Sequence, residues 1–242
     1  MKTFSRLLCL LLSLPALAQA SPLSEFESRA RNELIKPFAL DLGGVLGASS
    51  FPPGRALGFP GFEVGVVGAT QFRPDRDDLI LRNAGVKAFG LPLIHAAVGL
   101  PFRIDLVAHG VSAQGASIFG GGVRCGLFKS GLLTKFLPSV GVSAFGDKVN
   151  HGAFNAVHYA FNASAVWNLP FVEPFFGAGL DTTKVTVGAA AVPGVAGLSA
   201  TATGSRITAG ADVKPFPMVR LRAAYMLLHG IPGALFHIGI KF

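Results

Sequence analysis

Three polar residues near the middle of the chain carry side chains that a hydrolase could use. His158, Asn162 and Ser164 share one face of a segment in which polar and apolar residues alternate. A nucleophile and its base must lie within hydrogen-bond reach, whereas the six residues from His158 to Ser164 cover about 20 Å of extended chain. We therefore interpret them as structural, predict no catalytic residue and no enzyme, and keep a hydrolase as the remaining enzymatic alternative.

Metal and phosphate chemistry are also weakly indicated. The six histidines show no local ligand spacing. Strand pairing could bring two of them together, but a protein metal site normally needs three or four ligands. The glycine-rich run FGGGVRCG, residues 119 to 126, lacks the Lys-Ser/Thr ending and the helix of a phosphate loop. The sequence thus predicts no metal site, no cofactor and no cofactor-binding residue.

The charged residues show a more informative arrangement. In segments where every second residue is apolar, the charged residues occupy the positions between the apolar ones, so all charges share one parity. Strands that present one face to lipid and the other to a barrel interior have this pattern. Charges buried in such an interior must be paired or hydrated. The expected lumen-facing residues, which are also the candidates for lining a pore, are Arg103, Asp105, Arg124, Glu173, Arg206, Asp212, Lys214, Arg220, Arg222 and Lys241; Asp41, Glu63 and Asp181 share their parity.

The elements that would position these residues are β-strands. Half of the residues are hydrophobic and the mean hydropathy is +0.52, yet after residue 20 no run of 18 uninterrupted apolar residues offers a spanning helix. Only helices and closed barrels satisfy backbone hydrogen bonds inside a bilayer. The sequence predicts an all-β fold, a transmembrane antiparallel up-and-down β-barrel of about 12 strands with 10 as the alternative, because single-chain bacterial barrels have even strand numbers.

Two assignments near the start of this barrel are open to test. Phe38, Leu40 and Leu42 alternate with Asp41 and Gly43 and are expected to form the first strand. Residues 79 to 89 are the candidate for a twelfth strand.

Turn signals between the segments fall into two classes. Short connections containing Pro are GLPF, NLPF and KPFPM, at residues 99 to 102, 168 to 171 and 214 to 218. Longer ones are FGDKVNHGAF, GAAAVPGVAGLSATAT and HGIPGA, at residues 145 to 154, 188 to 203 and 229 to 234. Bacterial barrels alternate short periplasmic turns with longer external loops. A periplasmic C-terminus would therefore put the Pro turns in the periplasm, and a short hairpin at KPFPM would make Asp212 and Arg222 neighbours.

The first twenty residues have the pattern of a cleaved secretory signal. Lys2 and Arg6 precede the apolar stretch Leu7 to Leu14, and small residues lead to Ala20, the expected cleavage position. We expect a signal peptide at 1–20, a short periplasmic or lumen-plugging helical segment at 21–35 and the barrel at 36–242. Cleavage leaves a formal net charge of +6, because Lys2 and Arg6 are removed from +8. The remaining basic residues are scattered, so we predict no nucleic-acid partner.

The end of the chain resembles the C-terminal signature of Gram-negative outer-membrane β-barrel proteins. Phe236, Ile238, Ile240 and Phe242 occupy alternate positions and the last residue is Phe. The resemblance implies recognition of this strand as an assembly signal by the barrel assembly machinery, escort by periplasmic chaperones, and insertion among the lipids of the outer membrane of a Gram-negative bacterium. It implies neither a subfamily nor an oligomeric state.

Function is constrained mainly by the size of the barrel. An eight-stranded barrel is filled by its own side chains and one of 16 or more strands leaves a water channel, so about twelve strands lie between these cases. We expect a narrow, porin-like channel or transporter for small solutes. The alternative is a closed structural or interaction barrel that anchors or binds at the cell surface. The fold by itself does not name a solute.

Overall fold

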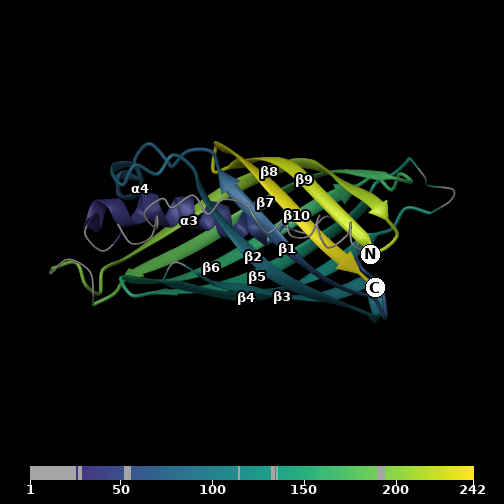
Figure 1. The fold of residues 1–242 in the computed structure, drawn as a ribbon, viewed down its shortest axis with the longest axis horizontal. Coiled ribbons are helices and arrows are strands. Elements are labelled where there is room, and N and C mark those ends of the chain that lie inside the picture. The colour runs from purple at the N-terminus through teal and green to yellow at the C-terminus, as the bar shows by residue number, and fades with distance from the viewer. Residues whose placement is uncertain are drawn as a thin grey trace, which may run out of the picture.

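Ten antiparallel strands close into a barrel in which β1 pairs with both β2 and β10 (Figure 1). The structure, a computed structural model, describes residues 26, 29–51, 56–113, 115–131, 134, 136–189 and 194–242. The alternative of ten strands is therefore confirmed and the expectation of about twelve is wrong. The strands are β1 Phe62–Gln71, β2 Phe89–Leu100, β3 Ile104–Ala113, β4 Ala116–Phe128, β5 Ser139–His151, β6 Phe154–Val166, β7 Val172–Val187, β8 Ser199–Phe216, β9 Val219–Leu228 and β10 Ile231–Lys241.

The strands form because their side chains alternate between lipid and lumen. Along β6, Tyr159 and Phe161 are exposed, whereas His158 and Asn162 are buried. Apolar outward residues continue from Val157 to the exposed Trp167 just beyond the strand. Ten residues at 3.3 Å each, tilted by about 40°, give a band about 25 Å tall, which is the height of the apolar belt of a transmembrane barrel.

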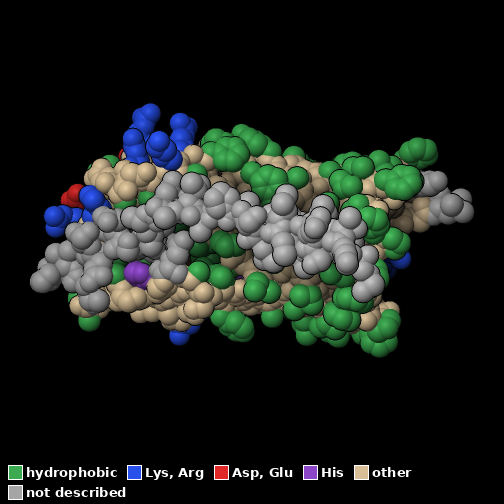
Figure 2. Space-filling model, in the orientation of Figure 1, with side chains coloured by type: hydrophobic (Ala, Val, Ile, Leu, Met, Phe, Trp, Pro, Cys, Tyr) green, Lys and Arg blue, Asp and Glu red, His purple; other side chains and the backbone are tan. Residues whose placement is uncertain are grey.

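The apolar belt covers the end of the barrel that carries the C-terminus. Figure 2 shows the hydrophobic side chains gathered there and Lys and Arg near the opposite end. Exposed phenylalanine side chains surround this C-terminal end: Phe62, Phe102, Phe128, Phe136, Phe171, Phe216 and Phe242. Such rings are typical of a membrane–water interface. Beyond the belt, outward positions of β7 and β8 become polar, with the Thr182 and Thr203 hydroxyls 3.2 Å apart, so this hairpin projects past the bilayer.

A helix, and not a first strand, occupies the segment before β1. The 3₁₀ turn η1, Asn32–Leu34, leads into α3, Ile35–Ser49. The apolar residues Phe38, Leu42 and Leu46 recur every four positions, which is a helical period. The strand prediction rested on the short alternation from Phe38 to Leu42, which fits a helix equally well. Pro37 lies in the first turn of α3, where its missing N–H removes no intrahelical hydrogen bond. The predicted start of the barrel at residue 36 is therefore wrong, since β1 begins at Phe62.

The prediction of a twelfth strand at residues 79 to 89 is also wrong. It contains α4, Leu79–Asn83, followed by a connection to β2. A side-chain cap starts this helix: an Asp78 carboxylate oxygen accepts from the backbone N–H of Leu81 at 3.1 Å. Among the described residues, no helix has the length and hydropathy needed to cross a membrane.

The connections match the turn predictions only in part. The three Pro-containing turns lie between β2 and β3, β6 and β7, and β8 and β9, all at the C-terminal end. At the opposite end, β5 and β6 are joined through Gly152 and Ala153, so the prediction of a long loop over residues 145 to 154 is wrong. HGIPGA likewise contributes only the turn at His229 and Gly230. The strands continue because their alternation extends beyond the apolar belt. The predicted signal peptide, its cleavage at Ala20, and residues 21–25, 27 and 28 of the segment 21–35 lie outside the described residues.

Candidate functional site

Helix α3 fills much of the barrel lumen. It starts near the end that carries α4 and runs between the strands (Figure 1), with 12 of its 15 residues buried. Two glycines allow close contact with the wall: a Cβ on Gly43 would collide with Thr183, and one on Gly47 with Asp181. The aromatic rings of Phe38 and Phe154 meet edge to face at 5.2 Å. The helix is therefore packed against the barrel wall from within.

A polar network around Asp181 attaches this helix to the wall. The Arg206 guanidinium donates from Nε to Asp181 Oδ2 and from Nη1 to the carbonyl oxygen of Gly47. It also donates to Asn162 Oδ1 at 2.7 Å. Arg206 and Asp181 are each 1 % exposed. A buried arginine thus connects α3, β6 and β7 from its position on β8.

Histidines extend this network around the lumen. His158 contacts two carboxylates, Asp147 through Nδ1 at 2.7 Å and Asp181 through Nε2 at 3.3 Å. His109 binds the other oxygen of Asp147, and His229 approaches Asp181 at 3.2 Å. Strand β4 lies between β3 and β5, and its Gly120 leaves the space in which His109 and Asp147 meet, because a Cβ there would collide with both. Three histidines and two aspartates therefore form a continuous chain.

A second group of ion pairs lies nearer the C-terminal end. Arg222 binds Asp212 through two hydrogen bonds, of 2.6 and 3.1 Å, so the predicted neighbours meet across the β8–β9 hairpin. Arg220 lies 3.6 Å from Glu63 and 3.7 Å from Asp212. The other close pairs are Arg124 with Asp105 at 2.6 Å and Lys214 with Glu173 at 2.6 Å. The cations are therefore matched by nearby carboxylates.

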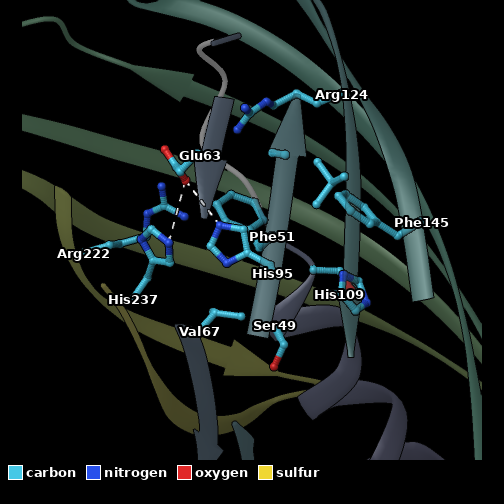
Figure 3. A pocket seen from close by; sticks show the side chains of 13 residues that line it. Ser49, Phe51, Glu63, Val67, His95, His109, Arg124, Phe145, Arg222 and His237 are labelled. Carbon is cyan, nitrogen blue, oxygen red and sulfur yellow. Dashed lines mark hydrogen bonds and ion pairs between the residues drawn. The ribbon is translucent and has the colours of Figure 1, made fainter. Parts of the chain in front are cut away.

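A small cavity separates the end of α3 from these ion pairs. Its volume is about 40 Å³, and its walls include Phe51, Glu63, His95 and Arg124 (Figure 3). On the C-terminal side, residues 56–61 precede β1, where the backbone N–H of Leu57 donates to both Asp105 oxygens at 3.0 Å. Lys241 donates to the Leu57 carbonyl oxygen at 3.2 Å. The segment before the first strand is therefore also bonded to the barrel interior near its C-terminal mouth.

Most of the predicted lumen-facing residues are buried inside the barrel, but one is not. Arg103 belongs to the exposed 3₁₀ turn η2, Pro101–Arg103, with φ of 62°, so its predicted lumen position is wrong. The chain reverses there, and the alternation that set its parity begins only at Ile104. Asp41 faces inward from α3 and not from a strand. The buried positions are Asp105, Arg124, Glu173, Arg206, Asp212, Arg220 and Arg222, while Lys214 and Lys241 are half-buried near the mouth.

The histidines were the main omission of the sequence analysis. Both ring nitrogens of His158 face carboxylates, and Asn162 donates to the hydroxyl of Ser143 at 3.2 Å. The expectation of no catalytic residue stays a prediction. Strand topology also brings Glu63, His95 and His237 together from three neighbouring strands. Their parity was a usable signal, but their mutual distances depend on register.

A basic cleft lies on the opposite end of the molecule, beyond the apolar belt. Four basic residues, Arg73, Arg76, Arg82 and Lys87, and a single carboxylate, Asp75, contribute charge to its walls, and its volume is about 790 Å³. All four basic residues are exposed, and among the described residues no ion pair neutralises them. The cleft therefore carries a local excess of positive charge.

Two buried aspartates lie beneath this cleft. Asp41 accepts from the Gln71 side chain at 2.7 Å and from the Asp75 backbone N–H at 2.8 Å. Burial raises the pKa of Asp41 to about 6 and that of Asp78 to about 8. The nearby Asp41 carboxylate contributes to the raised pKa of Asp78. The contacts of Asp41 with Gln71 and Asp75 join α3 to the end of β1 and to the connection that follows it.

A closed sheet with an apolar outer belt and a charged, protein-filled interior defines a transmembrane β-barrel. The chain has the fold of a transmembrane β-barrel.

Comparison with known proteins adds similarity of shape. No protein-family description and no curated protein sequence matches the chain. Among solved structures, the N-terminal barrel domain of OprF from Pseudomonas aeruginosa is similar at 14% identity over 75% of this chain and 97% of that one, with a TM-score of 0.39. Ail from Yersinia pestis, solved with the heparin analogue sucrose octasulfate, shows 14% identity over 76% and 100%, with a TM-score of 0.33.

The translocator domain of the autotransporter NalP from Neisseria meningitidis shows 12% identity over 76% of this chain and 88% of that one, with a TM-score of 0.36. These values describe a distant likeness. The functional conclusions therefore rest on the geometry of this chain alone.

Proposed function

We propose that this protein is a closed outer-membrane barrel whose external end binds phosphorylated head groups of the outer leaflet. The observation that carries the proposal is the basic cleft of Arg73, Arg76, Arg82 and Lys87 beside the end of the apolar belt. Phosphate groups are the natural partners of clustered guanidinium groups, because the planar guanidinium forms paired, charge-assisted hydrogen bonds. Lipid is favoured over a soluble anion because the exposed Phe72 directly precedes Arg73.

The filled lumen supports a closed barrel over an open pore. Helix α3 is packed between the strands and bonded to the wall through Arg206, and the cavity beyond it is about the size of one or two water molecules. A solute would have to displace the helix and break buried ion pairs. Binding at the surface requires neither change.

The test is binding of lipid A to the purified barrel in detergent, compared with dephosphorylated lipid A and soluble pyrophosphate. Wild-type protein should bind lipid A with an affinity that falls as salt rises, since exposed charges are screened. Changing Arg76 and Arg82 to Gln should weaken this binding, whereas changing Lys148 and Lys184 to Gln removes the same charge from exposed strand positions and should not.

Three results would count against this function. Equal binding of dephosphorylated lipid A would remove the phosphate argument. Equal loss in the Lys148 and Lys184 control would make net charge, and not the cleft, responsible. Tighter binding of pyrophosphate than of lipid A would point to a soluble anion as the occupant.

A narrow channel for small solutes is the second candidate. It is favoured by polar space that begins at the C-terminal mouth: a cavity of about 210 Å³ lies beside Lys214, Arg220 and Lys241. Arg220 reaches from there toward Glu63, which borders the smaller cavity below α3. Displacement of α3 would be needed to join this space to the outside.

Planar-bilayer recording distinguishes the two candidates. A closed barrel gives no stepwise conductance in wild-type protein. Conductance steps in wild-type protein would favour the channel if their ion preference shifts toward cations when Arg220 and Arg222 are changed to Gln. This result would rule out the closed barrel.

A further inference from the structure

We propose that Glu63, His95 and His237 form a binding site for one divalent transition-metal ion, Zn²⁺ above all, inside the lumen. The three residues come from adjacent strands: Glu63 from β1, His95 from β2 and His237 from β10. Figure 3 shows the three side chains pointing toward one another beside the small cavity. This site is separate from the basic cleft and does not depend on lipid binding.

Two glycines make room for this arrangement. Gly65 and Gly239 face each other across β1 and β10 and share the inward parity of Glu63 and His237. A Cβ on Gly65 would lie 2.9 Å from His237 Nε2, and one on Gly239 would lie 2.8 Å from His237 Cε1. The absence of both side chains lets the imidazole of His237 lie along the wall toward Glu63.

The distances between donor atoms suit a single ion. His95 Nε2 and His237 Nε2 lie 3.3 and 3.7 Å from Glu63 Oε1, and one donor atom from each residue lies within 4.8 Å of the others. Metal–ligand bonds of about 2.1 Å around a tetrahedral ion separate neighbouring ligand atoms by about 3.4 Å. Small side-chain rotations would therefore bring all three atoms to bonding distance.

The hydrogen-bonding state of these groups points to a missing ligand. His237 and Glu63 are 4 % and 5 % exposed. Among the described residues, neither ring nitrogen of His237 has a hydrogen-bond partner, and the same holds for His95 Nδ1 and Glu63 Oε2. Buried polar atoms in proteins are nearly always paired. Here the atoms without a hydrogen bond belong to three residues in mutual contact. A cation bound to His95 Nε2, His237 Nε2 and both oxygens of the Glu63 carboxylate would supply a partner for His237 Nε2 and for Glu63 Oε2.

The ligand set and its surroundings indicate the type of ion and its further ligand. Two imidazoles and one carboxylate with an open fourth position are a known zinc ligand set, and imidazole ligands also suit Cu²⁺ and Ni²⁺. Arg222 is neutralised by Asp212, but Arg220 lies 3.6 Å from Glu63. A divalent ion beside this cation has an excess of positive charge, which favours an anionic fourth ligand such as hydroxide or chloride.

The experiment is a metal titration of the folded protein. Barrel refolded in detergent with a chelator, then freed of it, is titrated with Zn²⁺ by calorimetry and with Co²⁺ by visible absorption. We expect one saturable site per chain and Co²⁺ bands of low coordination number. Glu63→Gln, His95→Gln and His237→Gln should each weaken Zn²⁺ binding by at least about 100-fold. Loss of a residue that only hydrogen-bonds to a metal ligand already weakens binding by up to about 100-fold, and loss of the ligand itself should cost at least as much.

A histidine at the other end of the barrel provides the matched control. His151→Gln removes one imidazole and should leave affinity and stoichiometry unchanged. Each variant is checked for the heat-modifiable migration of a folded barrel, and X-ray absorption of the zinc-loaded wild type reads the ligand set without any substitution. Two imidazoles and a carboxylate oxygen are expected, with hydroxide or chloride as the fourth ligand. The absence of saturable binding in folded wild type, or unchanged affinity in folded His237→Gln, would overturn the proposal.

Discussion

Removing the negative charge of Asp181 should cost more stability than any other single polar change in the lumen. Its two oxygens receive hydrogen bonds from Arg206, His158 and His229. Asp181→Asn keeps the shape of the side chain but leaves the Arg206 guanidinium, itself 1 % exposed, without its counterion. Breaking a buried pair by removing one partner costs about 3–5 kcal/mol, and we expect a loss in the free energy of unfolding within this range.

The assay is urea unfolding in phospholipid vesicles, followed by the fluorescence of Trp167, the single tryptophan. Thr182→Val, on the exposed side of the same strand, is the control and should change stability by no more than about 0.5 kcal/mol. Replacing the pair together, by Asp181→Leu with Arg206→Met, should cost less than Asp181→Asn alone, because no unpaired charge remains. A loss below about 1 kcal/mol for Asp181→Asn would refute a buried, charge-dependent attachment of α3.

Three further predictions concern the lipid face, pH and orientation. Ile238→Arg should cost about 2–4 kcal/mol in vesicle unfolding, because this exposed residue lies near the middle of the apolar belt; a negligible cost would contradict the outward register. Burial raises the pKa of Asp78 to about 8, so above pH 4 the folded state binds more protons than the unfolded state. The free energy of unfolding should therefore fall as pH rises from 5 to 9. Asp78→Asn keeps an oxygen to cap α4 and should flatten this dependence. With Cys125→Ser as background, a membrane-impermeant maleimide should label Glu33→Cys on intact cells and not Lys129→Cys, if the C-terminal end is periplasmic; the reverse labelling would invert the orientation.

The sequence by itself determined the class of fold and most inward positions. Alternation has a period of two, and a charge such as Arg124 or Asp212 can lie only on the side away from lipid, so parity alone identifies the face. The same local rule failed where a window was short. Over Phe38 to Leu42, strand and helix periods fit equally well, and only packing inside the barrel selects the helix. Arg103 was misplaced because parity does not carry through a turn.

The tertiary structure decided which inward residues meet. Arg206 reaches α3 at Gly47, 159 positions away in sequence, and such a contact depends on the helix entering the lumen. Glu63, His95 and His237 are scattered along the chain, but closure of the barrel through β1 and β10 places them on three adjacent strands. Pairing register and closure are non-local, since they depend on every strand in the ring. The candidate metal site and the filling of the lumen therefore follow from the closed fold and not from any local motif.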